Sequence, residues 1–157
     1  MFTDSPMPYS VFLPDEAATL ALGAKAAGLL NTPATVYLEG GLGAGKTTFA
    51  RGLLHALGYV GAVKSPTYAI VESYVLPQLC VRHFDLYRFA TPEEWTDAGL
   101  DEMLSGCLCL IEWPEMGGPY TPPADFPITL APEAGGRRCT IRACNPKQQK
   151  ELELWQN

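Results

Sequence analysis

Short blocks of apolar and β-branched residues along this chain predict a series of strands. Such blocks lie at 9–13, 35–38, 69–75, 81–87, 107–111, 128–130 and 139–142. The block at 107–111 is apolar on both faces, as expected for a central buried strand. The blocks at 69–75 and 81–87 are joined through residues 76–78, which predicts a hairpin laid into the sheet. The last two blocks flank Gly135 and Gly136 and predict a second pair.

Helices are predicted between these strands. A helix over about 14–30 is indicated by apolar residues at helical spacing, namely Leu20, Ala24, Ala27 and Leu30. A second helix follows residue 47 and ends near 57–58. Thr91 has the features of an N-cap, with Pro92 at the first helical position and Glu94 completing a capping box. This start predicts a helical stretch to about residue 104, interrupted near Gly99.

A glycine-rich turn joins the strand at 35–38 to the second helix. Residues 40–47 fit the pattern G-x-x-x-x-G-K-[ST] of a P-loop. The glycines let successive backbone N–H groups point at phosphate oxygens, and the helix start adds its positive dipole end. Lys46 would reach the β- and γ-phosphates and Thr47 the Mg²⁺ ion. Nucleotide binding is therefore predicted, the alternative being a plain strand-to-helix turn.

The order of these elements predicts an α/β P-loop fold. We expect a mainly parallel central sheet with antiparallel hairpin additions, flanked by helices. A chain of 157 residues is expected to form one domain over 1–157, whose tail at 145–157 is helical or frayed.

Composition narrows the function classes. A net charge of −6 and a pI near 4.8 disfavour unaided capture of RNA or DNA. Arg137, Arg138 and Arg142 are the best candidates for a local basic patch, although a solvated hairpin face is the favoured interpretation. The five cysteines have no zinc-type spacing and are expected to be free thiols. The start of the chain resembles no secretory signal, and no membrane segment is evident, so a soluble cytoplasmic protein is expected.

Two acids are placed for phosphate chemistry. Asp85 lies near the end of the strand at 81–87, and Glu112 follows the buried strand at 107–111. Ligands of open α/β sheets gather at the carboxyl ends of strands, which is also the edge that presents the P-loop. Both acids are therefore candidates to hold Mg²⁺ or to orient the attacking group.

The segment after the P-loop helix is a candidate switch. Ser65 and Thr67 occupy the interval where other P-loop proteins keep a loop that senses the γ-phosphate, with an ordinary proline turn as the alternative. His55 and His83 pair with no nucleophile or ligand pattern and are interpreted as structural.

Taken together, four motifs resemble the TsaE family of small bacterial P-loop ATPases. They lie in the family's order and spacing at 42–48, 65–68, 83–88 and 112–115, and the resemblance spans roughly 14–141. It implies ATP hydrolysis that serves two partners, TsaB and TsaD. That complex transfers a threonylcarbamoyl group to the adenosine next to the anticodon of tRNAs reading codons that begin with A. TsaE-like proteins do not perform the transfer, and tRNA is reached only through the complex.

The resemblance also implies roles for individual residues. The nucleotide would contact the P-loop and the late hairpin through Gly41, Gly43, Ala44, Gly45, Lys46, Thr47, Thr48 and Arg137. Thr47, Asp85 and Glu112 would share the Mg²⁺ and water roles, with Glu112 favoured as the direct ligand and Asp85 in support, and Trp113 would lie beside the site.

This chain departs from the family pattern in the P-loop. Gly41 stands where the family often has Asp, in a loop position that supplies mainly backbone. Arg82 and His83 precede Asp85, so that run is not the apolar strand of an ordinary Walker B motif, although it agrees with the family's own pattern.

Several rival functions can be weighed from the sequence. A GTPase is disfavoured, because no D-x-x-G follows the P-loop and no [NT]-K-x-D is present. A small-molecule kinase would need an arginine-bearing lid, but Arg88 is the one arginine between Asp85 and Glu112. A binding protein controlled by ATP occupancy without turnover stays open as the non-enzymatic alternative.

Overall fold

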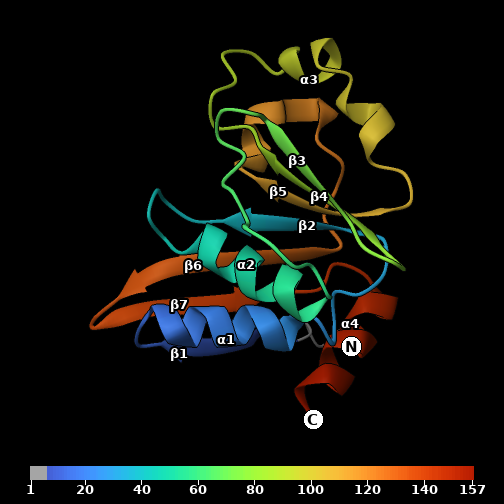
Figure 1. Cartoon of the computed structure of the whole chain (residues 1–157). Helices are drawn as coiled ribbons and strands as arrows, with labels where there is room; N and C mark the ends of the chain where they lie inside the picture. The colour runs from blue at the N-terminus through green and yellow to red at the C-terminus, as the bar shows by residue number, and fades with distance from the viewer. Residues whose placement is uncertain (1–6) are drawn as a thin grey trace, which may run out of the picture.

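The computed structural model describes residues 7–157, which form a single mixed sheet flanked by helices (Figure 1). The strands are β1 (Tyr9–Leu13), β2 (Ala34–Glu39), β3 (Val71–Val75), β4 (Cys80–Asp85), β5 (Cys107–Glu112), β6 (Phe126–Glu133) and β7 (Gly136–Ile141). The helices are α1 (Glu16–Ala26), α2 (Lys46–Ala56), α3 (Glu94–Asp97) and α4 (Pro146–Gln156), with 3₁₀ segments η1 (Leu100–Met103) and η2 (Pro114–Tyr120).

The sheet has a parallel centre and antiparallel edges. Its order is β1-β7-β6-β2-β5-β4-β3. The pairs β6–β2, β2–β5 and β5–β4 are parallel, whereas β1–β7, β7–β6 and β4–β3 are antiparallel. The predicted α/β fold with a mainly parallel core and antiparallel hairpin additions is therefore confirmed.

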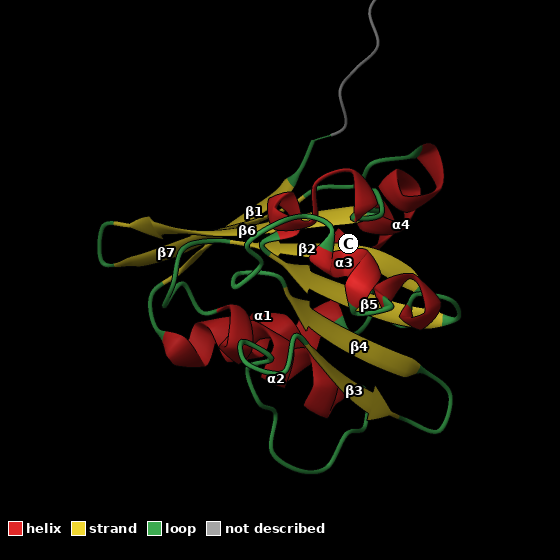
Figure 2. Cartoon of the chain, turned by 90° about the horizontal axis from the view of Figure 1, so that it is seen from above, coloured by secondary structure: helices red, strands yellow, loops and turns green. Residues whose placement is uncertain are grey.

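The two faces of the sheet bury two separate apolar clusters. One cluster lies under α1 and α2 and includes Val36, Leu38 and Leu110. The other includes Phe84 and Ile111. It lies under α3, which Figure 2 shows on the side of the sheet opposite α1 and α2. Because successive strand residues point to opposite faces, β4 and β5 contribute side chains to both layers.

Helices α1 and α2 cross with their backbones in contact. A Cβ on Gly23 would collide with the carbonyl oxygen of Phe49, and a Cβ on Gly52 with that of Leu20. This close approach turns small residues of α1 toward α2, and its buried residues are Thr19, Leu22, Gly23 and Ala26. The predicted apolar stripe is thus partly wrong, because Leu20 is 39% exposed and Ala24 is also exposed.

Several predicted boundaries shift for identifiable reasons. Helix α1 ends at Ala26 rather than near Leu30, because its last turn tightens to i→i+3 hydrogen bonds such as Leu29 N–H to the Ala26 carbonyl at 2.9 Å. Strand β3 begins at Val71 rather than 69. Ile70 has a φ of +68° and its N–H donates to the Pro66 carbonyl in a turn at 2.8 Å.

Helix α3 begins at Glu94, so Thr91 is not its N-cap. The first turn is instead closed by i→i+3 bonds, including Glu94 N–H to the Thr91 carbonyl at 3.2 Å. The predicted capping carboxylate is nonetheless in use, since Glu94 accepts from the Thr91 N–H at 3.0 Å. The helical path is interrupted at Gly99, which has a φ of +68°, as predicted.

The structure shows the conformation of the C-terminal tail and the state of the cysteines. The tail is helical: Asn145 caps α4 by accepting from the Gln148 N–H at 3.0 Å, and Leu152 is buried. All five cysteines are free, as predicted, and Cys107 and Cys109 share the buried face under α3. Within residues 7–157, no helix is both long enough and apolar enough to cross a membrane.

Candidate functional site

A cleft of about 320 Å³ opens where the P-loop meets the carboxyl ends of β4 and β5. Most of the predicted site residues line it: Gly43, Ala44, Gly45, Lys46, Thr47, Thr48, Ser65, Thr67, Asp85, Glu112, Trp113 and Arg137. Gly41 does not, because it faces a neighbouring hollow beside Pro114. Glu16, Thr19 and Leu42 also line the cleft, although no sequence pattern pointed to them.

The P-loop supplies backbone donors at the start of α2. Gly45 has a φ of +102°, and its carbonyl accepts the first full helical bond, from the Phe49 N–H at 2.9 Å. The N–H groups of Lys46, Thr47 and Thr48 have no partner within the helix, so they are free to bind an anion. The strand-to-helix turn of the P-loop therefore ends in an anion-binding helix start.

Arg137 reaches this loop from β7, on the other side of the cleft. Its Nη1 donates to the Gly43 carbonyl at 3.5 Å. The guanidinium also passes so close to Gly45 that a Cβ there would collide with it. Arg137 therefore brings a permanent positive charge beside the free N–H groups of the loop.

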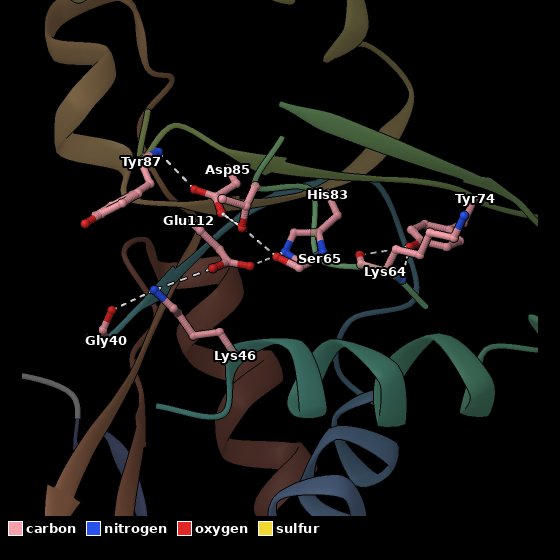
Figure 3. Close-up of polar contacts among 10 residues, drawn as sticks. Gly40, Lys46, Lys64, Ser65, Tyr74, His83, Asp85, Tyr87 and Glu112 are labelled. Carbon is pink, nitrogen blue, oxygen red and sulfur yellow. Dashed lines mark hydrogen bonds and ion pairs between the residues drawn. The ribbon is translucent and has the colours of Figure 1, made fainter. Parts of the chain in front are cut away.

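The Lys46 ammonium lies between the Gly40 carbonyl and the Glu112 carboxylate (Figure 3). It is 6% exposed, donates to the Gly40 carbonyl at 2.6 Å, and lies 3.5 Å from Oε1 of Glu112. It also lies over the Trp113 ring, 4.5 Å from the ring centroid. A buried cation needs such partners, and these contacts hold the Lys46 ammonium near the N-terminus of α2.

Glu112 ends β5 and is 4% exposed. Its Oε2 lies 2.6 Å from Nε2 of His83, and its Oε1 faces Lys46. Burial acts to raise the pKa of Glu112, but the hydrogen bond from His83, together with the Lys46 ammonium, outweighs it and holds this pKa below its ordinary value. Glu112 is thus a buried carboxylate kept in its ionised form.

Asp85 lies directly opposite Glu112 in the β4–β5 register. Its Oδ2 accepts from the Thr67 hydroxyl at 3.0 Å, and its Oδ1 accepts from the Tyr87 N–H at 2.9 Å. Thr67 in turn lies 2.7 Å from the Ser65 hydroxyl. The candidate switch segment is therefore tied to the cleft through one carboxylate.

His83 contacts a residue of the cleft, which no sequence pattern indicates. It is interpreted from the sequence as structural, and its ring lies against Glu112 without lining the cleft itself. The alternation of strand side chains indicates part of this arrangement, because residues two apart share a face, which places His83 on the same side as Asp85. The contact with Glu112 could not be predicted, because the sequence does not show that β4 pairs with β5.

Trp113 takes a backbone conformation that is rare for a bulky residue. Its φ is +55° and its ψ is +51°, directly before Pro114. Its ring packs on Tyr87 with centroids 4.9 Å apart. Unusual backbone of this kind is found disproportionately at functional sites, and here it brings the ring over Lys46.

The donor set of the cleft fits Mg²⁺ bound together with a triphosphate. Within residues 7–157, no three His, Cys, Asp or Glu side chains converge to hold a metal by themselves. Mg²⁺ commonly takes one or two carboxylates and completes its shell with phosphate oxygens and water. Glu112, Asp85 and the Thr47 hydroxyl line one cleft and provide that partial set.

Comparison with known proteins shows the family of this chain. Residues 13–140 match the family model described as "Threonylcarbamoyl adenosine biosynthesis protein TsaE". The chain belongs to the TsaE family. The TsaE protein of Haemophilus influenzae is 45% identical over 125 residues, which cover 76% of this chain and 79% of that protein. The TsaE protein of Treponema pallidum is 37% identical over 111 residues, covering 70% and 82%.

A solved structure agrees with the TsaE assignment. The crystal structure of Bacillus subtilis YdiB superposes with a TM-score of 0.75 at 27% identity, over 96% of this chain and 93% of that one. The TsaE match includes the P-loop, both carboxylates and Arg137, whereas α4 lies beyond it. Membership of the TsaE family, first indicated by motif resemblance, is therefore confirmed.

Proposed function

We propose that this chain is a Mg²⁺-dependent ATPase that assists the TsaB–TsaD complex. Its role would be in threonylcarbamoylation of the adenosine next to the anticodon in tRNAs reading codons that begin with A, with the transfer itself left to the complex. The observation that supports this most is the convergence of Lys46, Asp85 and Glu112 on a P-loop in one cleft. We further propose that the whole chain acts as one domain.

The P-loop residues would bind and orient the triphosphate. The free N–H groups of Lys46, Thr47 and Thr48 point a helix start at phosphate oxygens. Lys46 would exchange its contacts with Gly40 and Glu112 for the β- and γ-phosphates. Arg137 would add positive charge from the opposite wall, where charge spreads over the transferring phosphoryl group.

The two carboxylates would divide the remaining work. Bound Mg²⁺ would neutralise charge on the β- and γ-oxygens. Both oxygens of Asp85 already accept hydrogen bonds within the fold, from Thr67 and Tyr87, which suits a supporting role. Glu112 has one oxygen directed at Lys46 in the cleft, which suits the Mg²⁺ ligand or the group that orients the attacking water.

The segment around Thr67 would report nucleotide state to the partners. Its hydroxyl bonds Asp85, and the Ile70 carbonyl accepts from the Asp85 N–H at 2.8 Å. A change at Asp85 would therefore move two points of the same segment. Tyr68 beside them is 83% exposed and free to meet a partner.

Rival functions fit the cleft less well. Arg88, the one arginine available for a kinase lid, lies over the exposed ring of Tyr68 at 4.2 Å and does not line the cleft. A nucleotide-gated binding protein would use the same cleft without hydrolysing ATP, so a measurement of ATP turnover distinguishes it from the ATPase.

ATP turnover by the purified protein tests the proposal, alone and with TsaB, TsaD and tRNA. We expect stimulation by the partners, loss of turnover in Glu112→Ala, and much of the ATP binding retained. Glu115→Ala is the matched control, because Glu115 lies three residues further on and does not line the cleft. Tight ATP binding without turnover in any mixture would favour the nucleotide-gated binding protein instead. Normal hydrolysis by Glu112→Ala would overturn the role given to that residue.

A further inference from the structure

His83 differs from an ordinary core residue because it buries a polar ring. Its side chain is fully buried, and its Nδ1 has no hydrogen-bond partner in the part of the chain that the structure describes. A buried polar atom without a partner costs stability, and an apolar side chain at this position would avoid that cost. Among residues 7–157, the one polar contact that the ring makes is with Glu112, so that contact is where a function is to be sought.

The contact has a defined direction. Glu112 is a carboxylate and offers only acceptors, so the proton between Nε2 and Oε2 at 2.6 Å belongs to His83. Because Nδ1 has no acceptor, the neutral Nε2–H tautomer leaves no buried donor unpaired. His83 therefore donates one hydrogen bond to one chosen oxygen of the carboxylate.

The sheet makes this contact rigid. Parallel pairing of β4 and β5 places His83 opposite Leu110 and Asp85 opposite Glu112. His83 is thus one diagonal step from Glu112 on the same face, where both strands are held by neighbours. The ring and the carboxylate come from central strands rather than from loops.

We propose that His83 is a positioning residue, whose Nε2–H fixes Oε2 of Glu112 so that Oε1 faces Lys46 and the cleft (Figure 3). This inference rests on the proposed ATPase function. Without His83, the Lys46 ammonium is the remaining polar side-chain partner of Glu112 among the described residues. The carboxylate would then turn fully toward the ammonium and be misplaced for the hydrolytic step. Loss of such an orienting partner commonly costs about 10–100-fold in activity.

Two variants separate positioning from packing. His83→Leu fills the space without a donor, whereas the side-chain amide of His83→Gln can donate at the position of Nε2. We expect kcat to fall about 10–100-fold in His83→Leu with KM for ATP little changed, and to recover largely in His83→Gln. Val81→Ala is the matched control, since Val81 is a fully buried residue of β4 two positions earlier on the same face. A purely structural His83 would lower thermal stability in both variants and leave kcat per folded molecule unchanged, which would overturn the proposal.

A second readout does not depend on hydrolysis. In ¹⁵N spectra of the histidine rings, His83 should show the Nε2–H tautomer, and its signals should shift in Glu112→Gln while those of His55 do not. If wild-type protein hydrolyses no ATP in any mixture, the proposed function fails and this spectrum still decides the inference. An Nδ1–H tautomer, or a ring unaffected by Glu112→Gln, would overturn it.

Discussion

Near their carboxyl ends, strands β4 and β5 present polar side chains on one face and apolar side chains on the other. Toward α2, the ends of these strands present His83, Asp85 and Glu112, all buried and all polar, whereas Val81 and Leu110 lie further along the same face in the apolar cluster. Toward α3, they present Phe84 and Ile111, which are fully buried in an apolar layer. Since strand side chains alternate with a period of two, a single step along either strand passes from the site to the core.

The difference shows how a small protein supports a buried charged site. Burying Lys46 and Glu112 carries a desolvation cost that their mutual attraction offsets only in part. The apolar layer supplies the compensating stabilisation, and there the Trp95 ring stacks on Phe84 with centroids 6.0 Å apart. The apolar face of each strand thus stabilises the fold that holds the charged residues of the other face.

The largest effect is expected on the apolar face. Trp95 is fully buried, and its Nε1 donates to Asp101 at 2.7 Å. Trp95→Ala should lower the free energy of unfolding by about 3–5 kcal/mol because it leaves a large cavity. Urea denaturation measures this loss, and Mg-ATP affinity of the folded protein should be retained. A loss of affinity with little loss of stability would break the division between the faces.

The next effect is expected at the centre of the polar face. Lys46→Ala removes the ammonium that would meet the phosphates, and ATP binding or turnover should fall at least about 10²-fold. Calorimetric titration with Mg-ATP checks this. Lys25→Ala is the control, because the Lys25 ammonium lies over the Trp155 ring at 5.0 Å and does not line the cleft. Equal affinities in both variants would contradict the role of Lys46.

A smaller effect is expected where the polar face meets the switch segment. Thr67→Ala removes a hydrogen bond to a carboxylate, which corresponds to about tenfold in an equilibrium. The difference between TsaB–TsaD binding with and without ATP should shrink by that factor. Ser65→Ala should have less effect, because Ser65 contacts Thr67 rather than Asp85. Partner binding that stays equally sensitive to nucleotide in Thr67→Ala would remove the switch hypothesis.

The smallest effect is a dependence of stability on pH. Since the folded-state pKa of Glu112 is lowered, its ionised form contributes stability above the ordinary value of 4.5 and loses it as pH falls through the folded pKa. Wild-type stability should therefore decline relative to Glu112→Gln when the pH drops below 4.5. Denaturation curves of both proteins across that range measure the difference. A constant difference would mean that His83 and Lys46 do not hold the charge of Glu112.

The parts predicted from sequence were those with local signals. The P-loop pattern and the acids at predicted strand ends located the cleft, because glycine spacing and strand ends are visible in the chain itself. The fold class followed from the order of elements. The resemblance to the TsaE family extended this to Arg137, which no local pattern connects with the P-loop.

The parts that were missed depend on contacts between distant elements. The buried stripe of α1 was misplaced because a backbone contact at Gly23 and Gly52 decides which side meets α2. The contact of His83 with Glu112 could be predicted only with the neighbour of β4 known, and that neighbour lies more than twenty residues away in sequence. The left-handed turn at Ile70 has no residue signal, since glycine or asparagine is usual there.

The most direct test compares one residue from each face at adjacent positions of β5. The rate of Mg-ATP hydrolysis per folded molecule would be measured in Glu112→Gln and in Ile111→Ala, with the partners present. We predict that Glu112→Gln loses at least about 10²-fold while Ile111→Ala keeps a rate close to wild type despite its lower stability. Equal losses in the two variants, or full activity in Glu112→Gln, would contradict the assignment of hydrolysis to the polar face.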